Sequence, residues 1–578
     1  MTTTWDDPAT PWSSGPWTLE LRDDEIADIA YDRRVVVRSI RAVVRDADWN
    51  TAGWTIDAVD EGERMLRIGL RSTGLGSDVR GGLTVETDGD RLAVTFDAVS
   101  HGDFRTNRTG LVVLHPPGLA GSPLRVAHPG GSDERTAFPR AISAHQPVFD
   151  IAGLGWRSHG LDVDLTFEGD VFEMEDQRNW TDASFKTYSR PLALPFPYTL
   201  AGGEHVRQRV EVRVAGDTTD VASDDAEPIV LVSAGSFPRV GVSASTAPDP
   251  EPALPAIIGS ELLVELDLAT PTWKSALHRA AARGVPLDVR VVLPDPDPTA
   301  LKAFAEALEG LDVARVAVFH PVFHVSTSVF VQALREALRT AGVTATVVGG
   351  SRSHFTELNR EGSRLPDDLA ALVVTVTPLF HALSTAQLIE SVAMQRLVAQ
   401  QTVSYADGLP IHVGPVTLRP RFNDVATGPQ SAPGRSDLSE GYGAQFTGAV
   451  DPRQSRPELA AWVVASAAAL AVPGVSSIAY FEEWGPRGVY DEDGRAAPTA
   501  EALRALSDLA GGALLTGASP DGLVWAVGSR SADGAAVLAA NLDQVSRTLE
   551  IVLPLPRGGH DTVRATLDPR TWVRIDRA

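Results

Sequence analysis

The chain has 578 residues, a formal net charge of −24 at pH 7 and a sequence pI near 4.9. This length is too great for a single hydrophobic core, so we expect several domains. The acidic balance argues against nucleic acid or an anionic membrane surface as a partner, since either needs clustered Lys and Arg. The sequence has no cysteine, which excludes disulfides and thiolate nucleophiles. The amino terminus lacks the basic and apolar regions of a secretory signal, so we expect a cytoplasmic protein.

The first part of the chain has the pattern of an all-β sandwich. From about Trp17 to Val214, short alternating segments such as RMLRIGLRS and RLAVTFDAV are separated by Gly, Asp and Asn. The acidic, turn-rich run from Ala215 to Pro228 is typical of a linker. We therefore assign residues 1–225 to an amino-terminal β-sandwich.

Between Val240 and Glu483, apolar β-branched runs alternate with amphipathic, alanine-rich runs. Nearly continuous apolar strands that are each followed by a helix indicate a parallel sheet covered by helices. Eight such units fit a (β/α)8 TIM-type barrel, in which reactive side chains gather at the carboxyl ends of the strands. We expect residues 226–512 to form this catalytic barrel, with strands beginning near Arg239, Glu261, Leu287, Val313, Thr344, Leu369, Pro410 and Ser476.

Two features mark the last part of the chain. The longest apolar run begins at Leu459 and stops at Pro473, which is too short for a membrane span and fits a barrel helix. The later segments GLVWAVGS, AAVLAANL, RTLEIVLPL and TWVRIDR have the pattern of strands. Residues 513–578 are therefore expected to form a small carboxy-terminal β-sandwich domain.

One segment, from Phe172 to Tyr198, is unusually dense in charged and aromatic residues. It contains Glu173, Glu175, Asp176, Arg178, Asn179, Asp182 and Lys186 together with Trp180 and Tyr188. Dense charge mixtures often form buried networks, so the segment can pin the sandwich to the barrel. A direct role in sugar binding is the alternative interpretation.

Several longer motifs carry a resemblance to a known family. They are FEMEDQRNWTDASFKTYSRPLALPFPY at Phe172, VVRDADWNT at Val43, NRTGLVVLHP at Asn107, FPRAISAHQPVFDI at Phe138, GPVTLRPRFN at Gly414 and YFEEWGPRG at Tyr480. With these motifs the chain resembles the bacterial D-apionate lactonase family over nearly its whole length. The resemblance implies a hydrolase that opens D-apionolactone to D-apionate in the catabolism of the branched pentose apiose. We carry over no catalytic residues from it.

Lactone hydrolysis needs a nucleophile, a general base that activates it and donors for the developing oxyanion. The sequence has no G-x-S-x-G elbow, which makes an α/β-hydrolase serine mechanism improbable. It also has no cysteine. A carboxylate or histidine base, or a metal-activated water, remains.

Two glutamates are the first candidates for the chemistry. Glu357 follows the fifth expected strand and Glu482 ends the eighth, so the two can face each other across the barrel mouth. Strand alternation directs the neighbouring Glu483 the other way. A facing glutamate pair also serves glycosidases, which makes glycoside hydrolysis an alternative. Glu357 can instead cap its loop or pair with Arg352 and Arg360.

Histidines form a second set of candidates. His381 follows the sixth expected strand and is a candidate catalytic base, while His412 lies in the seventh and is a candidate for substrate binding. The pair His320 and His324 has a loose H-x3-H spacing, which is a weak metal signal. A barrel histidine can also be a hydrogen-bonded core residue. We expect no metal and no other cofactor.

Further polar and aromatic residues are expected to bind the substrate. Guanidinium groups can hold sugar hydroxyls, an oxyanion or a carboxylate product, and an indole can cover a sugar ring. Their alternative roles are ion pairing with the acidic surface and packing. The candidates are Arg352, Asn359, Arg419, Arg421, Asn423 and Trp484.

These observations favour a hydrolase that opens a small sugar lactone. In the expected mechanism Glu357 or a nearby histidine activates water, Arg419 holds the oxyanion and Glu482 protonates the leaving ring oxygen. A noncatalytic carbohydrate-binding protein on a decayed barrel is the alternative from another class. The sequence leaves the oligomeric state open.

Overall fold

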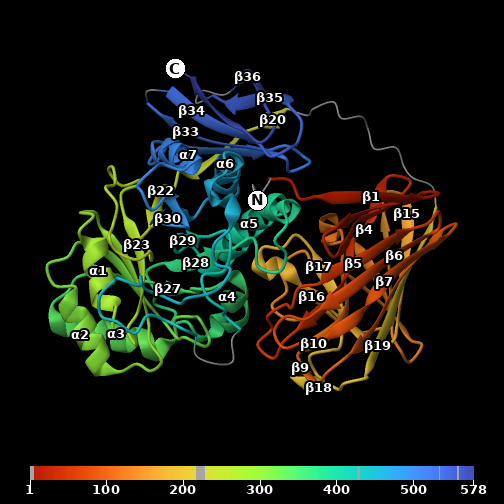
Figure 1. Cartoon of the computed structure of the whole chain (residues 1–578). Coiled ribbons are helices and arrows are strands. Elements are labelled where there is room, and N and C mark those ends of the chain that lie inside the picture. The colour runs from red at the N-terminus through yellow and green to blue at the C-terminus, as the bar shows by residue number, and fades with distance from the viewer. Residues whose placement is uncertain (1–4, 217–227, 426–429, 533, 556–558, 578) are drawn as a thin grey trace.

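The computed structural model describes residues 5–216, 228–425, 430–532, 534–555 and 559–577. Figure 1 shows three bodies: a β domain in red and orange, a barrel in green and teal, and a second β domain in blue. The expected fold class is thereby confirmed. Most of the expected linker, residues 217–227, lies outside the described residues.

The amino-terminal domain is a sandwich of two antiparallel sheets. In the strand Met65–Ser72 (β6), Leu66, Ile68 and Leu70 are buried and alternate with less buried residues, as a strand with one face on a core requires. One sheet has the order β1-β2-β3-β4-β10-β17-β16-β13 and the other the order β12-β11-β14-β15-β19-β8-β7-β6-β5. Besides β6, the strands are β1 (Ala9–Ser14), β2 (Trp17–Arg22), β3 (Glu25–Tyr31), β4 (Arg34–Arg45), β5 (Thr55–Glu61), β7 (Val79–Asp88), β8 (Arg91–Ser100), β9 (Phe104–Thr106), β10 (Arg108–Leu114), β11 (Pro123–Ala127), β12 (Asp133–Ala137), β13 (Val148–Ile151), β14 (Gly153–Ser158), β15 (Leu161–Glu168), β16 (Phe172–Asp176), β17 (Phe185–Ser189), β18 (Tyr198–Leu200) and β19 (His205–Ala215).

The central domain is a parallel barrel whose strands match the eight expected positions. The fifth strand is split: the amide of Val348, between its two halves, donates to Val316 O (2.9 Å) on one side, and that of Gly349 to Ala371 O (3.3 Å) on the other. The chain itself thus closes the barrel between β25 and β28. The strands are β22 (Arg239–Ser243), β23 (Leu262–Asp267), β24 (Leu287–Val292), β25 (Val313–Phe319), β26 (Thr346–Val347), β27 (Gly349–Gly350), β28 (Leu372–Val376), β29 (Ile411–Val416) and β30 (Val475–Trp484), with β31 (Gly488–Tyr490) beside β30.

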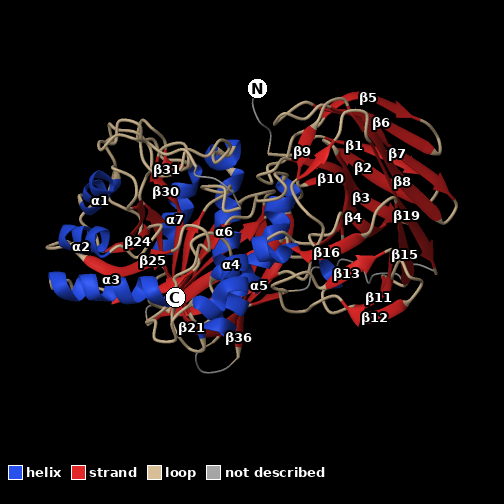
Figure 2. Cartoon of the chain, turned by 90° about the horizontal axis from the view of Figure 1, so that it is seen from below, coloured by secondary structure: helices blue, strands red, loops and turns tan. Residues whose placement is uncertain are grey.

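Helices surround the barrel, whereas the amino-terminal domain is built of strands, as Figure 2 shows. The helix Pro298–Ala307 (α2) begins as its sequence predicts, because the Asp297 carboxylate accepts a hydrogen bond from the amide of Thr299 (2.9 Å). The remaining helices are α1 (Trp273–Ala281), α3 (Ser328–Ala341), α4 (Phe355–Glu361), α5 (Thr385–Ala406), α6 (Glu458–Leu470) and α7 (Pro498–Ser507).

The carboxy-terminal domain also uses a segment that precedes the barrel. Strands β20 (Ile229–Val230) and β21 (Val232–Ser236) pair with β35 and β32, although the expected barrel range began at residue 226. Strand periodicity does not specify a pairing partner, so this contribution was not visible in the sequence. The other strands are β32 (Ala513–Ala518), β33 (Val524–Ser531), β34 (Gly534–Asn541), β35 (Arg547–Pro554), β36 (His560–Leu567) and β37 (Trp572–Arg577).

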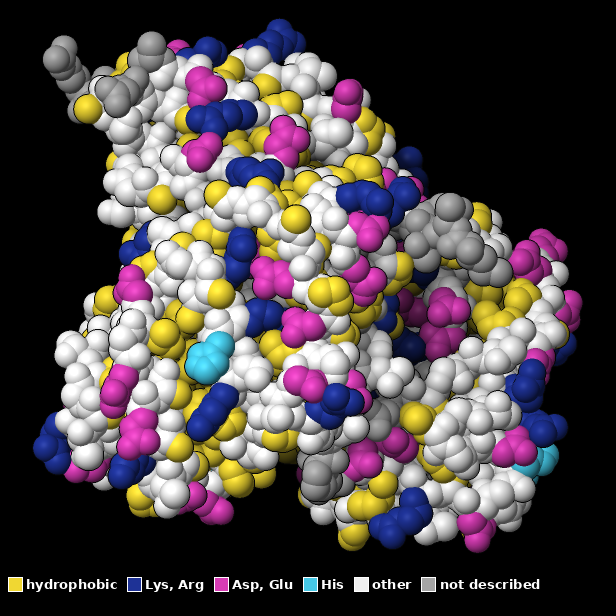
Figure 3. Space-filling model, turned by 60° about the vertical axis from the view of Figure 1, so that its left-hand side comes forward, with side chains coloured by type: hydrophobic (Ala, Val, Ile, Leu, Met, Phe, Trp, Pro, Cys, Tyr) yellow, Lys and Arg dark blue, Asp and Glu magenta, His cyan; other side chains and the backbone are white. Residues whose placement is uncertain are grey.

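The surface carries charged side chains of both signs, and the longest apolar run of the sequence is buried. On the face drawn in Figure 3, basic side chains are interspersed with acidic ones over the described residues. The apolar run from Leu459 forms α6, which is buried between the barrel and the carboxy-terminal strands. No helix within the described ranges has both the length and the apolarity needed to cross a bilayer.

Candidate active site

A large cleft of about 1090 Å³ lies between the amino-terminal sandwich and the loops at the carboxyl ends of barrel strands. The sandwich contributes the end of β4, the start of β10 and strands β16 and β17, while the barrel contributes the loops after β28 and β29. Three expected site residues line this cleft: His381, Arg419 and Asn423. The cleft therefore has the location at which barrel chemistry is expected.

The cleft holds a histidine–aspartate pair that joins the two domains. His381 Nδ1 lies 2.7 Å from Asp182 Oδ2, and both side chains are almost fully enclosed. With Nδ1–H donating to the carboxylate, the lone pair of Nε2 is left to accept a proton. A carboxylate that orients a histidine in this way is the arrangement used by general bases.

The electrostatics of the pair keep the imidazole uncharged. Burial lowers the pKa of His381 well below its usual value, and the nearby charges of Lys186 and Arg45 lower it further. Burial also raises the pKa of Asp182 well above its usual value, against the attraction of Lys186. At neutral pH the pair therefore presents a neutral histidine, which is the basic form.

The segment 172–198 positions Asp182 through a network of ion pairs and hydrogen bonds. Asp176 pairs with Arg178 (2.7 Å), and Arg178 Nη2 donates to the carbonyl groups of Pro139 (2.9 Å) and Ala141 (3.1 Å). A left-handed residue, Thr181 (φ +67°), then turns the chain so that Asp182 meets the barrel. The network pins the sandwich loops, and the same segment supplies cleft residues.

Beyond Asp182, the sandwich supplies charged and aromatic walls to the cleft. Lys186 forms an ion pair with Glu175, and burial lowers the pKa of Lys186 to about 8 although Glu175 opposes the shift. Trp180 stacks on Phe380 from the barrel with ring centroids 6.0 Å apart and planes 7° apart. Such aromatic faces suit a sugar ring. For Glu175, Lys186 and Trp180 the sequence offered sugar binding only as one of two interpretations of their segment, and it gave no indication of Phe380.

Arg419 and Asn423 reach the cleft from the loop after β29. Arg419 donates to Asp451 (2.7 Å), which fixes the guanidinium while leaving donors over. Asn423 Nδ2 approaches Asp48 O and Asn50 Oδ1 of the sandwich at 3.4 Å each. Both side chains therefore belong to the lining of the cleft.

Glu357 has a local structural role in the structure. It is the third residue of α4, where its Oε2 accepts hydrogen bonds from Ser353 Oγ (2.5 Å) and from the amide of His354 (2.9 Å). This is a capping box, which is one of the alternatives open for this residue. Burial raises the pKa of Glu357. Among the described residues that line the cleft, Glu357 is not found.

Glu482 is also held by neighbours outside the cleft. Its Oε2 accepts from the amide of Thr246 (3.1 Å), and its Oε1 accepts from Thr246 Oγ1 (2.8 Å) and pairs with Arg487 (2.6 Å). Glu483 points elsewhere and pairs with Arg283 (2.7 Å), as strand alternation predicts. Glu357 and Glu482 are thus each held by hydrogen bonds to neighbouring residues, and neither is among the described residues that line the cleft.

Two expected substrate-binding arginines form a buried network inside the barrel mouth. Glu265 Oε1 accepts from Arg352 (2.7 Å) and pairs with Arg421 (3.0 Å). Burial opposes ionisation, but the two guanidinium groups outweigh it and lower the pKa of Glu265 to about 2. Arg352 also contacts His324 Nδ1 (3.1 Å). The two arginines are therefore held by Glu265 at the mouth of the barrel, and neither is among the described residues that line the cleft.

Asn359 and Trp484 occupy structural positions. Asn359 Nδ2 donates to Asn179 Oδ1 (3.0 Å) and to Ile142 O (3.1 Å), so it joins α4 to the sandwich. Trp484 is buried in the barrel core and lies under the Arg279 guanidinium at 5.3 Å. Packing, the alternative interpretation of Trp484, agrees with this position.

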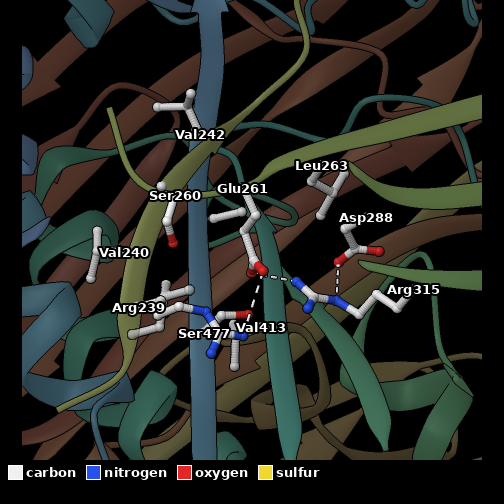
Figure 4. A pocket seen from close by; sticks show the side chains of 13 residues that line it. Arg239, Val240, Val242, Ser260, Glu261, Leu263, Asp288, Arg315, Val413 and Ser477 are labelled. Carbon is white, nitrogen blue, oxygen red and sulfur yellow. Dashed lines mark hydrogen bonds and ion pairs between the residues drawn. The ribbon is translucent and has the colours of Figure 1, made fainter. Parts of the chain in front are cut away.

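His412 lies at the end of the barrel opposite the cleft, because it is the second residue of β29 whereas the cleft residues follow the end of that strand. It hydrogen-bonds Ser477 Oγ (2.8 Å) and borders a depression of about 430 Å³. Figure 4 shows the adjoining ion pairs, in which Arg315 bridges Glu261 and Asp288. Networks at this end of a barrel serve stability. His412 is therefore not one of the described residues that line the cleft.

The histidines with H-x3-H spacing have separate partners. His320 Nδ1 accepts from the amides of Val322 (3.0 Å) and Phe323 (3.2 Å), whereas His324 Nε2 contacts Asp424 O (3.0 Å). His320 is thus used by its own turn, whereas His324 bonds to residues far along the chain, Asp424 and Arg352. Across the described ranges, no three His, Asp or Glu side chains gather as a metal site.

Comparison with known proteins assigns the chain to a family. A family model described as the D-apionate lactonase N-terminal domain matches residues 1–217, and one described as the D-apionate lactonase TIM barrel domain matches residues 243–511. The D-apionate lactonase of Brucella anthropi is 28% identical over 547 residues, which covers 86% of this chain and 87% of the relative.

Solved structures give more distant likenesses. A GH30 endoxylanase from Clostridium papyrosolvens C71 is 11% identical with a TM-score of 0.38, covering 60% of this chain and 99% of its own. A putative aldose 1-epimerase from Escherichia coli K12 is 12% identical with a TM-score of 0.28, covering 36% and 99%. The two family models together span both the sandwich and the barrel that enclose the cleft. The chain therefore belongs to the D-apionate lactonase family.

Proposed function

We propose that this chain is a carboxylic-ester hydrolase that opens a sugar lactone, with D-apionolactone as substrate and D-apionate as product. The observation that carries the proposal is the His381–Asp182 pair in the interdomain cleft. Family membership supports the substrate class. The two glutamates that a glycosidase would use, Glu357 and Glu482, are not among the described residues that line this cleft. A noncatalytic binding protein would have no need of a histidine that is oriented by a carboxylate and kept uncharged.

In the proposed reaction His381 acts first as a base and then as an acid. Nε2 takes a proton from water as the water oxygen bonds to the lactone carbonyl carbon. The tetrahedral intermediate then collapses, the carbon–oxygen bond of the ring breaks and the imidazolium returns the proton to the leaving alkoxide. The net change adds one water, and the new carboxylic acid ionises to release one proton. Asp182 holds the imidazole ring in place through Nδ1 during both steps.

The oxyanion of the intermediate needs donors that are already in place. Arg419 is fixed by Asp451 at the cleft wall and is the proposed donor from the barrel. Lys186 adds positive charge from the sandwich. Fixed donors in an enclosed site cost no reorganisation as charge develops, and one such donor contributes about 10²–10³ in rate. The site would therefore be formed by both domains.

We place the reaction in apiose catabolism and in the bacterial cytoplasm. The relative's name supports the first assignment. The absence of cysteine fits a compartment in which disulfides do not form.

The proposal is tested by a pH-indicator assay with D-apionolactone, a panel of aldonolactones and aryl glycosides, each with and without EDTA. We expect acid release from D-apionolactone that persists in EDTA, because the proposed base is a histidine. Turnover of a glycoside together with silence on every lactone would reject the proposal.

A further inference from the structure

Two arginines in the cleft lie side by side without an acidic partner. Arg45 ends β4 and Arg108 begins β10, and the two residues are direct cross-strand partners in the antiparallel ladder. Both line the cleft. Like charges placed directly opposite each other on a sheet destabilise it. This arrangement is therefore unfavourable in the free protein unless something else compensates it.

The protein compensates the two charges only from a distance, because the carboxylates of Glu175 and Asp182 raise the pKa of Arg45 without forming an ion pair with it. Within the described ranges, no carboxylate lies within ion-pairing distance of either guanidinium, and Arg45 donates instead to the carbonyl oxygen of Trp49 (2.9 Å). Glu175, the cleft carboxylate whose pKa responds to the charge of Arg108, forms its ion pair with Lys186. The carboxylates nearest to the two arginines are therefore engaged elsewhere, Glu175 with Lys186 and Asp182 with His381.

Arg108 is buried, rigid and still has an unused donor. Its residue is only 4% exposed, and its Nε has no hydrogen-bond partner in the described part of the chain. The guanidinium lies over the Tyr188 ring at 3.6 Å and near the Trp49 ring at 5.3 Å, so aromatic contacts hold it in place. Burial, followed by repulsion from Arg108, lowers the pKa of Arg45 to about 10. A buried charge without a partner is costly.

We propose that Arg45 and Arg108 form a carboxylate-binding subsite that holds the acid produced by ring opening. The planar guanidinium matches a carboxylate through paired hydrogen bonds, and the proposed reaction forms one carboxylate in this cleft at each turnover. The inference rests on the proposed function for the identity of the anion. It adds that the sandwich recognises the product, an aldonate, and that the enzyme is inhibited by it.

The test is isothermal titration calorimetry of the full chain with D-apionate, acetate, inorganic phosphate and a neutral polyol of similar size. We expect D-apionate to bind, phosphate to bind more weakly and Arg108→Gln to weaken D-apionate binding at least about tenfold, since hydrogen bonds to charged groups are lost. The matched control is Arg80→Gln, which removes an exposed arginine of β7 paired with Asp78 and should leave binding unchanged.

Arg108→Lys serves if Arg108→Gln fails to fold, because lysine keeps the charge and loses the planar fork; we expect intermediate affinity from it. Unchanged D-apionate binding in a folded Arg108 variant, or tighter binding of phosphate, would overturn the subsite. The titration needs no turnover. A chain that binds D-apionate through Arg108 but opens no lactone refutes the proposed function alone, whereas lactone opening with unaltered product binding in the variant refutes the subsite alone.

Discussion

At the scale of single residues, the environment of His381 decides its chemistry. Its imidazole is enclosed, bonded to Asp182 through Nδ1 and close to Lys186 and Arg45. Each of these cations disfavours the imidazolium, and burial acts in the same direction. The proposed base is consequently unprotonated over the physiological pH range.

The shifted histidine predicts how activity depends on pH. Because the folded pKa of His381 lies below the ordinary value of 6.5, the basic form persists as pH falls through 6.5 and is lost only at lower pH. We therefore expect kcat/KM to stay level as pH falls from about 7 through 6.5 and to decline only further into acid. Initial rates from pH 4.5 to 8, corrected for spontaneous opening, give the profile; a half-maximal rate above pH 6.5 would speak against His381 as the base.

The sequence could place some site residues and not others. His381, Arg419 and Asn423 follow barrel strands, so the alternation of strands and helices was enough to bring them to one end of the barrel. Asp182 and Lys186 come from another domain, and no local pattern states which face of the sandwich meets the barrel. The charge density of their segment indicated importance without giving a position.

At the scale of elements, α4 shows that a position after a barrel strand does not by itself fix which contacts a side chain makes. Glu357 does follow the fifth strand, but three residues after His354 it occupies the N3 position of the helix and turns back to the backbone. The amide of His354 and the hydroxyl of Ser353 occupy its Oε2. The capping hydrogen bonds thus turn the Glu357 side chain toward the start of its own helix, although the residue follows a barrel strand.

Replacement of Glu357 should act on stability through this cap. Glu357→Ala removes the acceptor of both hydrogen bonds, and we expect a loss of about 0.5–2 kcal/mol, the range for helix capping interactions. Glu357→Gln keeps an acceptor and should retain both most of the stability and turnover within a few fold. Thermal melts and lactone assays of the two variants are the measurement. Abolished turnover in a fully folded Glu357→Gln protein would restore this glutamate to the chemistry.

At the scale of the whole molecule, contacts between the domains hold the cleft together. Arg38 of the sandwich pairs with Glu390 of α5 (3.1 Å), and Thr181 Oγ1 donates to Thr377 O beyond β28 (3.2 Å). The amino-terminal segment also reaches α5, where Asp7 Oδ2 accepts from the amide at the first residue of that helix (2.5 Å). These contacts join residues that are almost 200 or more positions apart in the sequence. Local sequence patterns therefore predicted the domains but did not predict which of their faces are in contact.

The most direct test of the interdomain site is kcat for D-apionolactone in His381→Gln, measured beside Glu482→Gln in proteins of equal thermal stability. We predict that His381→Gln loses about 10²–10⁴ in kcat, the usual contribution of a general base. Glu482→Gln should retain activity within about tenfold, because Glu482 is occupied by Thr246 and Arg487. Near wild-type turnover in His381→Gln, with Glu482→Gln inactive, would contradict the account and move the chemistry into the barrel mouth.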